Sequence, residues 1–327
     1  MMRAVQFDRY GGSEVLQVRS VPVPAPRSGE VLVRVHASGL NPKDVIVRRG
    51  SLRLLSGRKF PRGTGSDFAG EVAGLGDRVT GLAAGDRVWG FLDGFLGGAA
   101  AEYVSVPQRW LSPMPARLGW LEASALPLVA TTALHGLRDV ARVRPGDQVL
   151  IKGASGGVGS AAIQVAKARG ARVTALATGD GIEHCAALGA DNVVDYRRSP
   201  PESLGPRFDV FLDCIGSSPY RAYRRLFRRG GRWVSVAPEP VIYFLTPLSR
   251  LTAPVLGGPR LGFVVVRPRS SDLLEVARMV EQGVLRMPVT ATYRLEDIAA
   301  AHDAVGARHG RGKRVVGVSD EALRQTP

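Results

Sequence analysis

The sequence has few cysteines, few lysines and no long uninterrupted apolar run. Cys185 and Cys214 are the only cysteines among 327 residues, so a disulfide scaffold and a cysteine-built zinc site are both excluded. The first residues lack the apolar core of a secretory signal. The most apolar stretch, 241–256, is interrupted by Pro247, Arg250 and Pro254 and is too short to cross a bilayer. We therefore expect a cytoplasmic protein without a transmembrane segment.

Arginine supplies most of the positive charge. The formal net charge is +15, and only five of the 44 basic residues are lysines. Near residue 225 the arginines recur at helical spacing, which predicts one basic helix face opposite Tyr223, Leu226 and Phe227. Such a face is either a solvated surface over a buried stripe or a dock for an anionic partner: nucleic acid, lipid headgroups or a phosphorylated carrier. The six arginines are Arg221, Arg224, Arg225, Arg228, Arg229 and Arg232.

Three regions of the chain differ in their pattern of expected strands and helices. Residues 1–122 hold short alternating β-like runs between Gly and Pro, which predicts a compact antiparallel barrel or sandwich. Residues 123–267 alternate strand-like and helix-like segments, which predicts a doubly wound parallel sheet of an α/β protein. Residues 268–327 read as helix, strand (289–294), helix (296–307) and strand (313–318). This tail is too short to fold alone, so we expect it to complete the first region.

A glycine-rich loop follows the predicted strand 148–152 and opens a predicted helix. Its residues 153–159 match the dinucleotide fingerprint as Ala154-x-Gly156-x-x-Gly159, with alanine at the usual first glycine. Glycine lets the backbone turn tightly and approach a pyrophosphate, whose charge then meets the free N–H groups of the helix N-terminus. The strand–loop–helix setting predicts a dinucleotide site.

The end of the next predicted strand bears on which dinucleotide is bound. NAD enzymes usually place a carboxylate there for the ribose 2′-hydroxyl. Here the strand ends at Thr178, and a hydroxyl does not repel a 2′-phosphate. Tyr196, Arg197 and Arg198, after the following strand, add a phenol and two cations, whereas Asp180 counts against a phosphate. We expect NADPH rather than NADH.

With these motifs in place, the sequence resembles the medium-chain dehydrogenases/reductases, in their zinc-free quinone oxidoreductase branch. The best fit is to the subgroup related to mitochondrial reticulon-interacting reductases and bacterial NAD(P)-dependent alcohol dehydrogenases. The resemblance covers nearly the whole chain and rests on several separated motifs in order. Besides the glycine loop, they are residues 35–44, 65–72, 85–88, 101–104, 188–191, 195–196 and 309–313.

The resemblance implies a GroES-like β-barrel catalytic domain, 1–122 completed by 268–327, and a Rossmann domain at 123–267. It also implies a set of cofactor-binding residues. Asn41 and Thr132 would face the nicotinamide, and Asn41 is also the candidate catalytic residue. The pyrophosphate would be held by Ser155, Gly156, Gly157 and Val158, and the 2′-phosphate would contact Thr178 and Tyr196. Two further segments would close over the cofactor: Gly262, Phe263 and Val264, and His309, Gly310 and Arg311.

The resemblance also bears on metal chemistry. Zinc alcohol dehydrogenases carry a cysteine in the segment that here holds Asn41, and a His-Glu pair where this chain has Ser66-Asp67. No cysteine precedes residue 185, so that ligand set is incomplete and we expect no zinc. Hydride addition to a quinone or an α,β-unsaturated carbonyl suits such a site, because conjugation spreads the developing charge. Asn41 is the expected donor to that oxygen.

Several alternatives remain open at this stage. The chain could be a cofactor-binding scaffold or an RNA-associated protein with little catalysis. It could also be a biosynthetic enoyl reductase whose arginines meet an anionic, carrier-bound substrate. The apolar segment 241–256 could be a lid, a dimer contact, a membrane-surface patch or ordinary core. We also expect a homodimer.

Overall fold

The computed structural model describes residues 1–57, 59–205, 207–216, 218–237, 240–256, 258–307 and 310–324, with a few side chains inside helices left undescribed. The chain divides into two compact units. The first comprises residues 1–131, 267–309 and 313–327, and the second comprises residues 132–266 and 310–312. Residues 123–131 therefore pack with the first unit, although the alternation of strand-like and helix-like segments begins at residue 123. Within the described ranges, no helix is long and apolar enough to cross a membrane.

The first unit is built on two β-sheets. One has the strand order β2-β1-β4, and the other has the order β15-β16-β3-β5-β6-β8, with β7 also paired to β3. The neighbouring strands are antiparallel except β15 and β16, which run parallel. The strands are β1 (Met2–Phe7), β2 (Gln17–Val21), β3 (Glu30–Gly39), β4 (Arg62–Gly63), β5 (Asp67–Leu75), β6 (Arg87–Phe91), β7 (Tyr103–Pro107), β8 (Leu111–Pro113), β15 (Val289–Arg294) and β16 (Lys313–Gly317).

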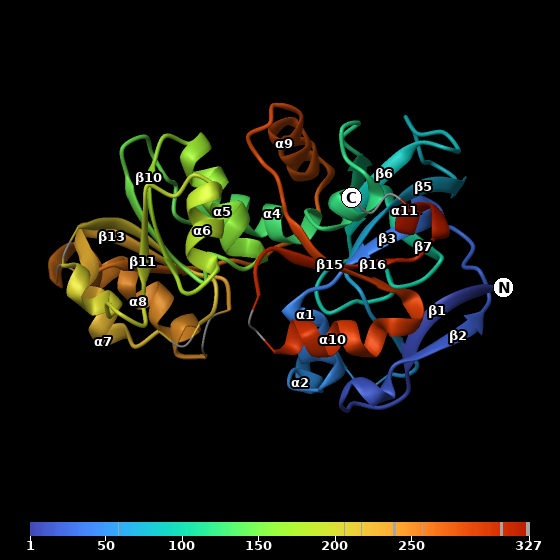
Figure 1. Cartoon of the computed structure of the whole chain (residues 1–327), viewed down its shortest axis with the longest axis horizontal. Helices are drawn as coiled ribbons and strands as arrows, with labels where there is room; N and C mark the ends of the chain where they lie inside the picture. Colours follow the sequence, from blue (N-terminus) through green and yellow to red (C-terminus); the bar gives the residue numbers. More distant parts are fainter. Residues whose placement is uncertain are drawn as a thin grey trace. The chain divides into compact units, whose positions relative to one another are not determined.

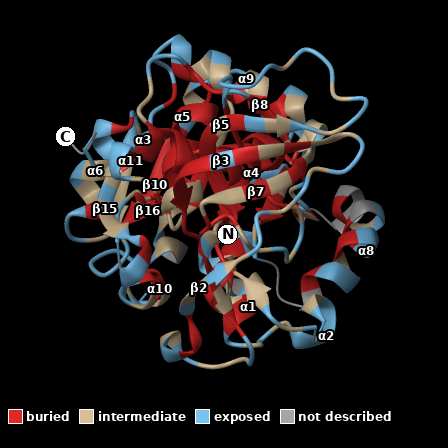
Figure 2. Ribbon diagram, turned by 90° about the vertical axis from the view of Figure 1, so that its right-hand side faces the viewer, coloured by how far each residue is buried: buried red, intermediate tan, exposed pale blue. Residues whose placement is uncertain are grey.

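Alternation along these strands builds the core of the first unit. Val31, Val33 and Val35 of β3 are almost completely buried, and they pack in one cluster with Phe68 and Val316. Figure 2 shows this buried interior around β3 and β5. The tail supplies β15, β16 and a helix that joins the same cluster. The helices are α1 (Pro42–Arg48), α2 (Arg53–Ser56), α3 (Trp120–Ser124), α9 (Ser270–Glu281), α10 (Ile298–Gly306) and α11 (Asp320–Arg324).

The second unit is a six-stranded parallel sheet in the order β11-β10-β9-β12-β13-β14. This order reverses at β9 and β12, as in a doubly wound sheet, which confirms the expected fold class. Its elements are coloured green to orange in Figure 1. The strands are β9 (Gln148–Lys152), β10 (Arg172–Ala177), β11 (Asn192–Asp195), β12 (Phe208–Asp213), β13 (Phe227–Ser235) and β14 (Arg260–Phe263), and the helices are α5 (Gly157–Ala168), α6 (Gly181–Ala187), α7 (Tyr220–Tyr223), the 3-10 turn η5 (Arg224–Leu226) and α8 (Pro240–Leu256). Helix α4 (Pro127–Leu134) crosses the division between the units.

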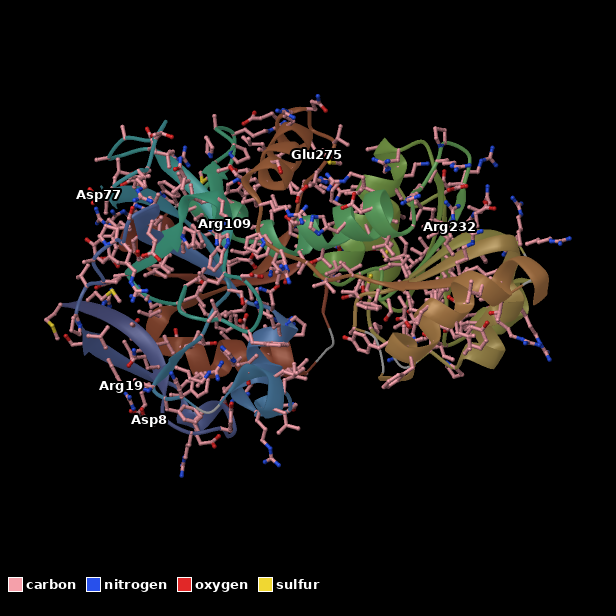
Figure 3. The ribbon with its side chains drawn as sticks, turned by 180° about the vertical axis from the view of Figure 1, so that it is seen from behind. Asp8, Arg19, Asp77, Arg109, Arg232 and Glu275 are labelled. Carbon is pink, nitrogen blue, oxygen red and sulfur yellow. The ribbon has the colours of Figure 1, made fainter. Side chains whose placement is uncertain are left out.

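The structure corrects the predicted basic helix. The last of its arginines do not lie on a helix, because β13 begins at Phe227 and Arg228, Arg229 and Arg232 belong to that strand. Figure 3 labels Arg232 on β13, where its guanidinium pairs with Asp147. Two adjacent glycines after Arg229 disfavour a helix, and the run that follows fits a buried strand. Arg221 and Arg224 begin the segment on α7 and η5. A single helical arginine face therefore does not form.

The glycines also shape the start of β13. Phe208 of β12 pairs with Phe227, but the next paired residues are Val210 and Arg232. Residues 228–231 therefore form a β-bulge opposite a single residue of β12. Gly230 has φ +82°, a conformation that favours glycine. The strand resumes its regular register at Arg232.

Candidate functional site

The glycine loop joins β9 to α5 in the second unit. Gly153 has φ +72°, and Gly156 caps α5 with an extended backbone (φ −74°, ψ 174°). No side chain caps this helix end. The first N–H groups of α5 therefore have no intrahelical acceptor, and together with the helix dipole they favour an anion. Ser155, Gly156, Gly157 and Val158, the predicted pyrophosphate residues, all lie at this end.

Two glycines of the fingerprint have different roles. A Cβ at Gly159 would lie 2.2 Å from the carbonyl oxygen of Gly153 and 2.5 Å from Cα of Ala154, so the helix could not pack against the loop. A Cβ at Gly156 would meet only that carbonyl, at 3.4 Å. Gly159 is therefore needed for folding, whereas the space beside Gly156 is open to a ligand. Ala154 is completely buried, which shows that the loop accommodates alanine at the first position.

The segment 310–312 lies directly against the glycine loop. Gly312 forms an isolated parallel bridge with Gly156, and its N–H donates to the carbonyl oxygen of Ser155 at 3.0 Å. This contact brings the predicted residues Gly310 and Arg311 beside the loop. His309, also predicted to close over the cofactor, lies outside the described residues.

The carboxyl ends of β10 and β11 bring together the residues predicted to recognise a 2′-phosphate. The N–H of Tyr196 donates to the carbonyl oxygen of Ala177 at 3.3 Å, so Tyr196 follows β11 beside Thr178. The Tyr196 side chain is about half exposed. The Arg311 guanidinium lies 3.5 Å from the Asp180 carboxylate, and both side chains are solvent-accessible. The carboxylate that counted against a phosphate therefore has a cation beside it.

The remaining predicted cofactor residues of this unit lie nearer β14. A Cβ at Gly262 would lie 2.6 Å from Cγ1 of Val140, so glycine allows close packing there. Phe263 ends β14 and contacts Tyr243 of α8 edge to face, with ring centroids 4.6 Å apart. Val264 follows and is buried, and Thr132 is buried on α4. The sheet order separates β14 from β10 by β9, β12 and β13. Phe263 and Val264 are therefore separated by three strands from the predicted residues at the end of β10.

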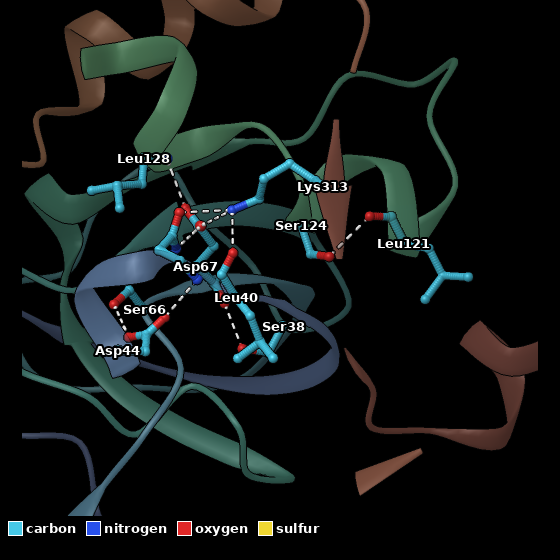
Figure 4. Close-up of polar contacts among 10 residues, drawn as sticks. Ser38, Leu40, Asp44, Ser66, Asp67, Leu121, Ser124, Leu128 and Lys313 are labelled. Atoms are coloured by element: carbon cyan, nitrogen blue, oxygen red, sulfur yellow. Dashed lines mark hydrogen bonds and ion pairs between the residues drawn. The ribbon is translucent and has the colours of Figure 1, made fainter. Parts of the chain in front are cut away.

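Asn41 belongs to the first unit, where it hydrogen-bonds to two buried charged residues, Asp67 and Lys313. Figure 4 shows Asp67 and Lys313 with their other partners. Lys313 Nζ donates to Oδ1 of Asn41 at 2.7 Å and to the carbonyl oxygen of Leu40 at 2.8 Å, and it lies 3.3 Å from Oδ2 of Asp67. Asp67 also accepts from Nδ2 of Asn41 and from the N–H of Leu128, both at 2.7 Å. Lys313 and Asp67 are each at most 4% exposed. All three ammonium protons thus have acceptors.

This network fixes the orientation of the Asn41 amide. Lysine can only donate, so the oxygen of Asn41 must face Lys313 and the nitrogen must face Asp67. One N–H of Asn41 donates to Asp67, and the amide carries a second N–H. The backbone of Asn41 is held as well, because its N–H donates to Asp44 at 2.8 Å in a capping box at the start of α1.

Burial dominates the electrostatics of Asp67. Removal from water raises the pKa of the Asp67 carboxyl, whereas the Lys313 ammonium and the hydrogen bonds from Asn41 and Leu128 act in the opposite direction. Burial likewise lowers the pKa of Lys43, whose ammonium donates to the carbonyl oxygen of Gly94. The charge of Asp67 is therefore balanced by one cation and two further hydrogen-bond donors.

The residues at the zinc-ligand positions have protein partners. The Ser66 hydroxyl donates to Oδ1 of Asp44 at 2.6 Å, and Asp67 is paired with Lys313. Among the residues with described positions, no three His, Cys, Asp or Glu side chains are grouped as a metal site requires.

Sequence reasoning missed three residues that organise these sites. Lys313 was noted only as part of a motif, although a lysine at the start of a buried strand needs an acceptor. Gly312 was not singled out. Lys152 ends β9, and its ammonium donates to Ser218 Oγ at 2.8 Å and to the carbonyl oxygen of Gly216 at 3.3 Å. Lys152 thus holds the segment after β12 beside the glycine loop.

Comparison with known proteins agrees with both units. Residues 27–116 match the alcohol dehydrogenase GroES-like domain, and residues 188–316 match the zinc-binding dehydrogenase family. The chain is 30% identical to the chloroplast envelope quinone oxidoreductase homolog of Arabidopsis thaliana, over 97% of this chain and 98% of that protein.

Solved structures show the same relationship. The quinone oxidoreductase from Coxiella burnetii superposes with a TM-score of 0.88 at 30% identity, covering 97% of this chain and 99% of that one. The Escherichia coli quinone oxidoreductase complexed with NADPH gives 0.83 at 25% identity, covering 97% and 100%. The chain is therefore an oxidoreductase of the nicotinamide-dependent type, and it belongs to the quinone oxidoreductase branch of the medium-chain dehydrogenase/reductase superfamily.

Proposed function

We propose that this protein is a zinc-independent, NADPH-dependent reductase that transfers hydride to a quinone or an α,β-unsaturated carbonyl. The observation that carries the proposal is the uncapped N-terminus of α5 beside Gly156, where a ligand can approach the backbone. A pyrophosphate fits this end because it supplies the negative charge that the free N–H groups and the helix dipole attract.

The preference for NADPH is supported by the groups around the end of β10. Thr178 places a hydroxyl where a carboxylate would repel a 2′-phosphate, and Tyr196 adds a phenol beside it. Arg311 supplies a cation 3.5 Å from Asp180. The E. coli relative was solved with NADPH, which supports the same choice.

The chain's own residues would bind and orient the reactants. When bound, the reduced nicotinamide supplies the hydride. Asn41 is our candidate donor, through its second amide N–H, to the acceptor oxygen that gains charge. Lys313 and Asp67 hold the two ends of the amide, so the donor is oriented before the substrate arrives. Charge on a quinone or enone oxygen is delocalised, so a hydrogen-bond donor can serve where a simple alcohol would need a metal.

Gly156→Ala tests the proposal at the point on which it depends. The added methyl meets protein only at 3.4 Å, so the variant should fold like the wild type. The methyl would occupy the space beside the loop, so the Kd for NADPH should rise at least about tenfold, the cost of one lost close backbone contact. Gly74→Ala is a matched control, because its Cβ would meet only Leu32 at 3.7 Å or more, away from the loop.

The measurements are calorimetric titration with NADPH and NADH, and NADPH oxidation across a panel of quinones and enones. Turnover of at least one acceptor by the wild type, lost together with NADPH affinity in Gly156→Ala, is the expected result. Equal NADPH affinity in the wild type and Gly156→Ala would refute the assigned cradle. Tight NADPH binding without turnover of any acceptor would favour the scaffold alternative, and turnover of carrier-linked enones alone would favour the biosynthetic enoyl reductase.

A further inference from the structure

Arg48 is a buried arginine at the end of α1. Its side chain is completely buried, and none of its three guanidinium nitrogens has a hydrogen-bond acceptor among the described residues. Removing a charged group from water is unfavourable unless an opposite charge or hydrogen-bond acceptors replace that water. The guanidinium of Arg48 therefore needs an acceptor that the described protein atoms do not supply.

His302 is a second buried group with an unsatisfied nitrogen, and it lies on α10. Its Nε2 lies 3.0 Å from the hydroxyl oxygen of Thr64, whereas Nδ1 has no hydrogen-bond partner in the described part of the chain. Burial, followed by the charge of Arg48, lowers the pKa of His302 to about 3, so the imidazole is neutral at pH 7 and carries one N–H. When the Thr64 hydroxyl donates to Nε2, that N–H lies at Nδ1 and also needs an acceptor.

Arg48 and His302 belong to one buried region of the first unit. Helices α1 and α10 pack together, and Val45 and Val305 join them in the same hydrophobic cluster. Figure 1 shows the two helices side by side. The effect of the Arg48 charge on the pKa of His302 shows that the two side chains are near each other. The N–H of Gly11 donates to the carbonyl oxygen of Arg48 at 3.1 Å, so the segment after β1 lies against this end of α1.

The acidic residues that act on Arg48 have other hydrogen-bond partners. Burial lowers the pKa of the Arg48 guanidinium, and the charges of Asp303 and Glu14 oppose this effect. Both carboxylates are exposed, and they accept hydrogen bonds from the Ser13 hydroxyl and from the N–H of Gly12. Neither accepts a hydrogen bond from Arg48. The buried charge is therefore attracted from the surface without being paired.

We propose that Arg48 and His302 bind a small monovalent anion, chloride, inside the first unit. Chloride accepts N–H hydrogen bonds and also supplies negative charge. Water would satisfy the same donors but would leave the guanidinium charge uncompensated away from bulk solvent. The formal net charge of +15 favours anion binding further. The glycine loop belongs to the second unit, so this site does not depend on the proposed function.

Thermal unfolding of the full-length protein in sodium chloride and in sodium gluconate, at the same ionic strength, tests the proposal. Exchanging gluconate for about 0.2 M chloride should raise the Tm of the wild type by at least about 3 °C and in a saturable manner, because a ligand of the folded state stabilises it by mass action. Arg48→Gln should lose this chloride response, because it removes the buried cation. Arg49→Gln is the matched control: Arg49 is the next residue and is exposed, so the variant loses the same charge and should respond like the wild type.

Crystals of the wild type grown with sodium bromide give a readout that does not depend on the folding of a variant. Bromide has the charge of chloride and scatters anomalously, so we expect an anomalous peak within hydrogen-bond distance of both the Arg48 guanidinium and Nδ1 of His302. Ordered water without anomalous signal at this position would overturn the proposal. Equal Tm values of the wild type in the two salts would overturn it as well, and so would the same chloride response in the wild type and Arg48→Gln.

Discussion

Replacement of Lys313 by methionine should destabilise the first unit more than any exposed charge change. The substitution leaves Asp67, which is completely buried, with two neutral donors and no cation. Removing one partner of a buried ion pair costs about 3–5 kcal/mol. For a unit of this size, that corresponds to a fall in Tm of about 6–20 °C. Differential scanning calorimetry at pH 7.5 measures the change.

The double variant Lys313→Met/Asp67→Asn separates loss of the pair from loss of packing. Asparagine keeps acceptor and donor atoms near Asn41 and Leu128 without a buried charge. We expect it to recover more than half of the lost stability, because the penalty arises mainly from the uncompensated carboxylate.

The dependence on pH gives an independent check. Burial already raises the pKa of Asp67, and loss of the Lys313 ammonium raises it further. The folded variant then holds this proton more tightly than the unfolded chain, so its stability increases as the pH falls through the folded pKa. Lys313→Met should therefore regain stability as the pH is lowered from 7.5, and the double variant should not. The reasoning is refuted if Lys313→Met is within about 1 kcal/mol of the wild type, or if the double variant is no more stable than the single one.

Three other predictions concern titratable groups. Asp180→Asn should raise the ratio of kcat/KM for NADPH to kcat/KM for NADH about fivefold, because the Asp180 carboxylate no longer competes with the 2′-phosphate for Arg311. Arg311→Gln should lower this ratio. Unchanged ratios in steady-state kinetics would contradict both expectations. Burial raises the pKa of Cys185 to about 12, and burial and Asp213 raise the pKa of Cys214, so neither thiol should react with a chromogenic disulfide at pH 8 until the protein unfolds. Burial, followed by Arg48, lowers the pKa of His302 to about 3. The unfolded chain binds this proton at a higher pH than the folded protein does, so the free energy of unfolding falls as the pH drops below about 6.5. In urea titrations at pH 5, His302→Gln should remove about 2 kcal/mol of that loss. A parallel decline in the wild type and the variant would contradict this prediction.

Local sequence signals predicted the second unit well. The strand–loop–helix pattern around Gly156 depends only on residues that are neighbours in the sequence. The predicted strand 148–152 therefore coincides with β9. The last strand is harder to place: the apolar run 263–266 favours a strand there, whereas β14 spans Arg260–Phe263. The reason is the neighbouring strand, because β13 ends at Ser235, the partner of Phe263. Residues beyond that point have no strand to pair with.

The buried network could not be predicted, because its members are distant in sequence. Asp67 and Lys313 are separated by 246 positions. Neither position carries a local pattern that predicts the other. They come together because β3 pairs with β16, which begins at Lys313, and also with β5, which begins at Asp67. The basic helix failed for a related reason. The spacing of its arginines matched a helix, but two glycines and a buried strand partner outweighed that periodicity.

The β-bulge at the start of β13 has a consequence for engineering the protein. Residues 228–231 are added opposite one residue of β12, and the register is restored at Arg232. Because the sheet already accommodates surplus chain there, a short peptide tag inserted between Arg229 and Gly230 would lengthen an existing protrusion without shifting the hydrogen-bonded partners. The same exposed arginines make this turn a natural cleavage point for trypsin, so limited digestion would cut the chain within the second unit.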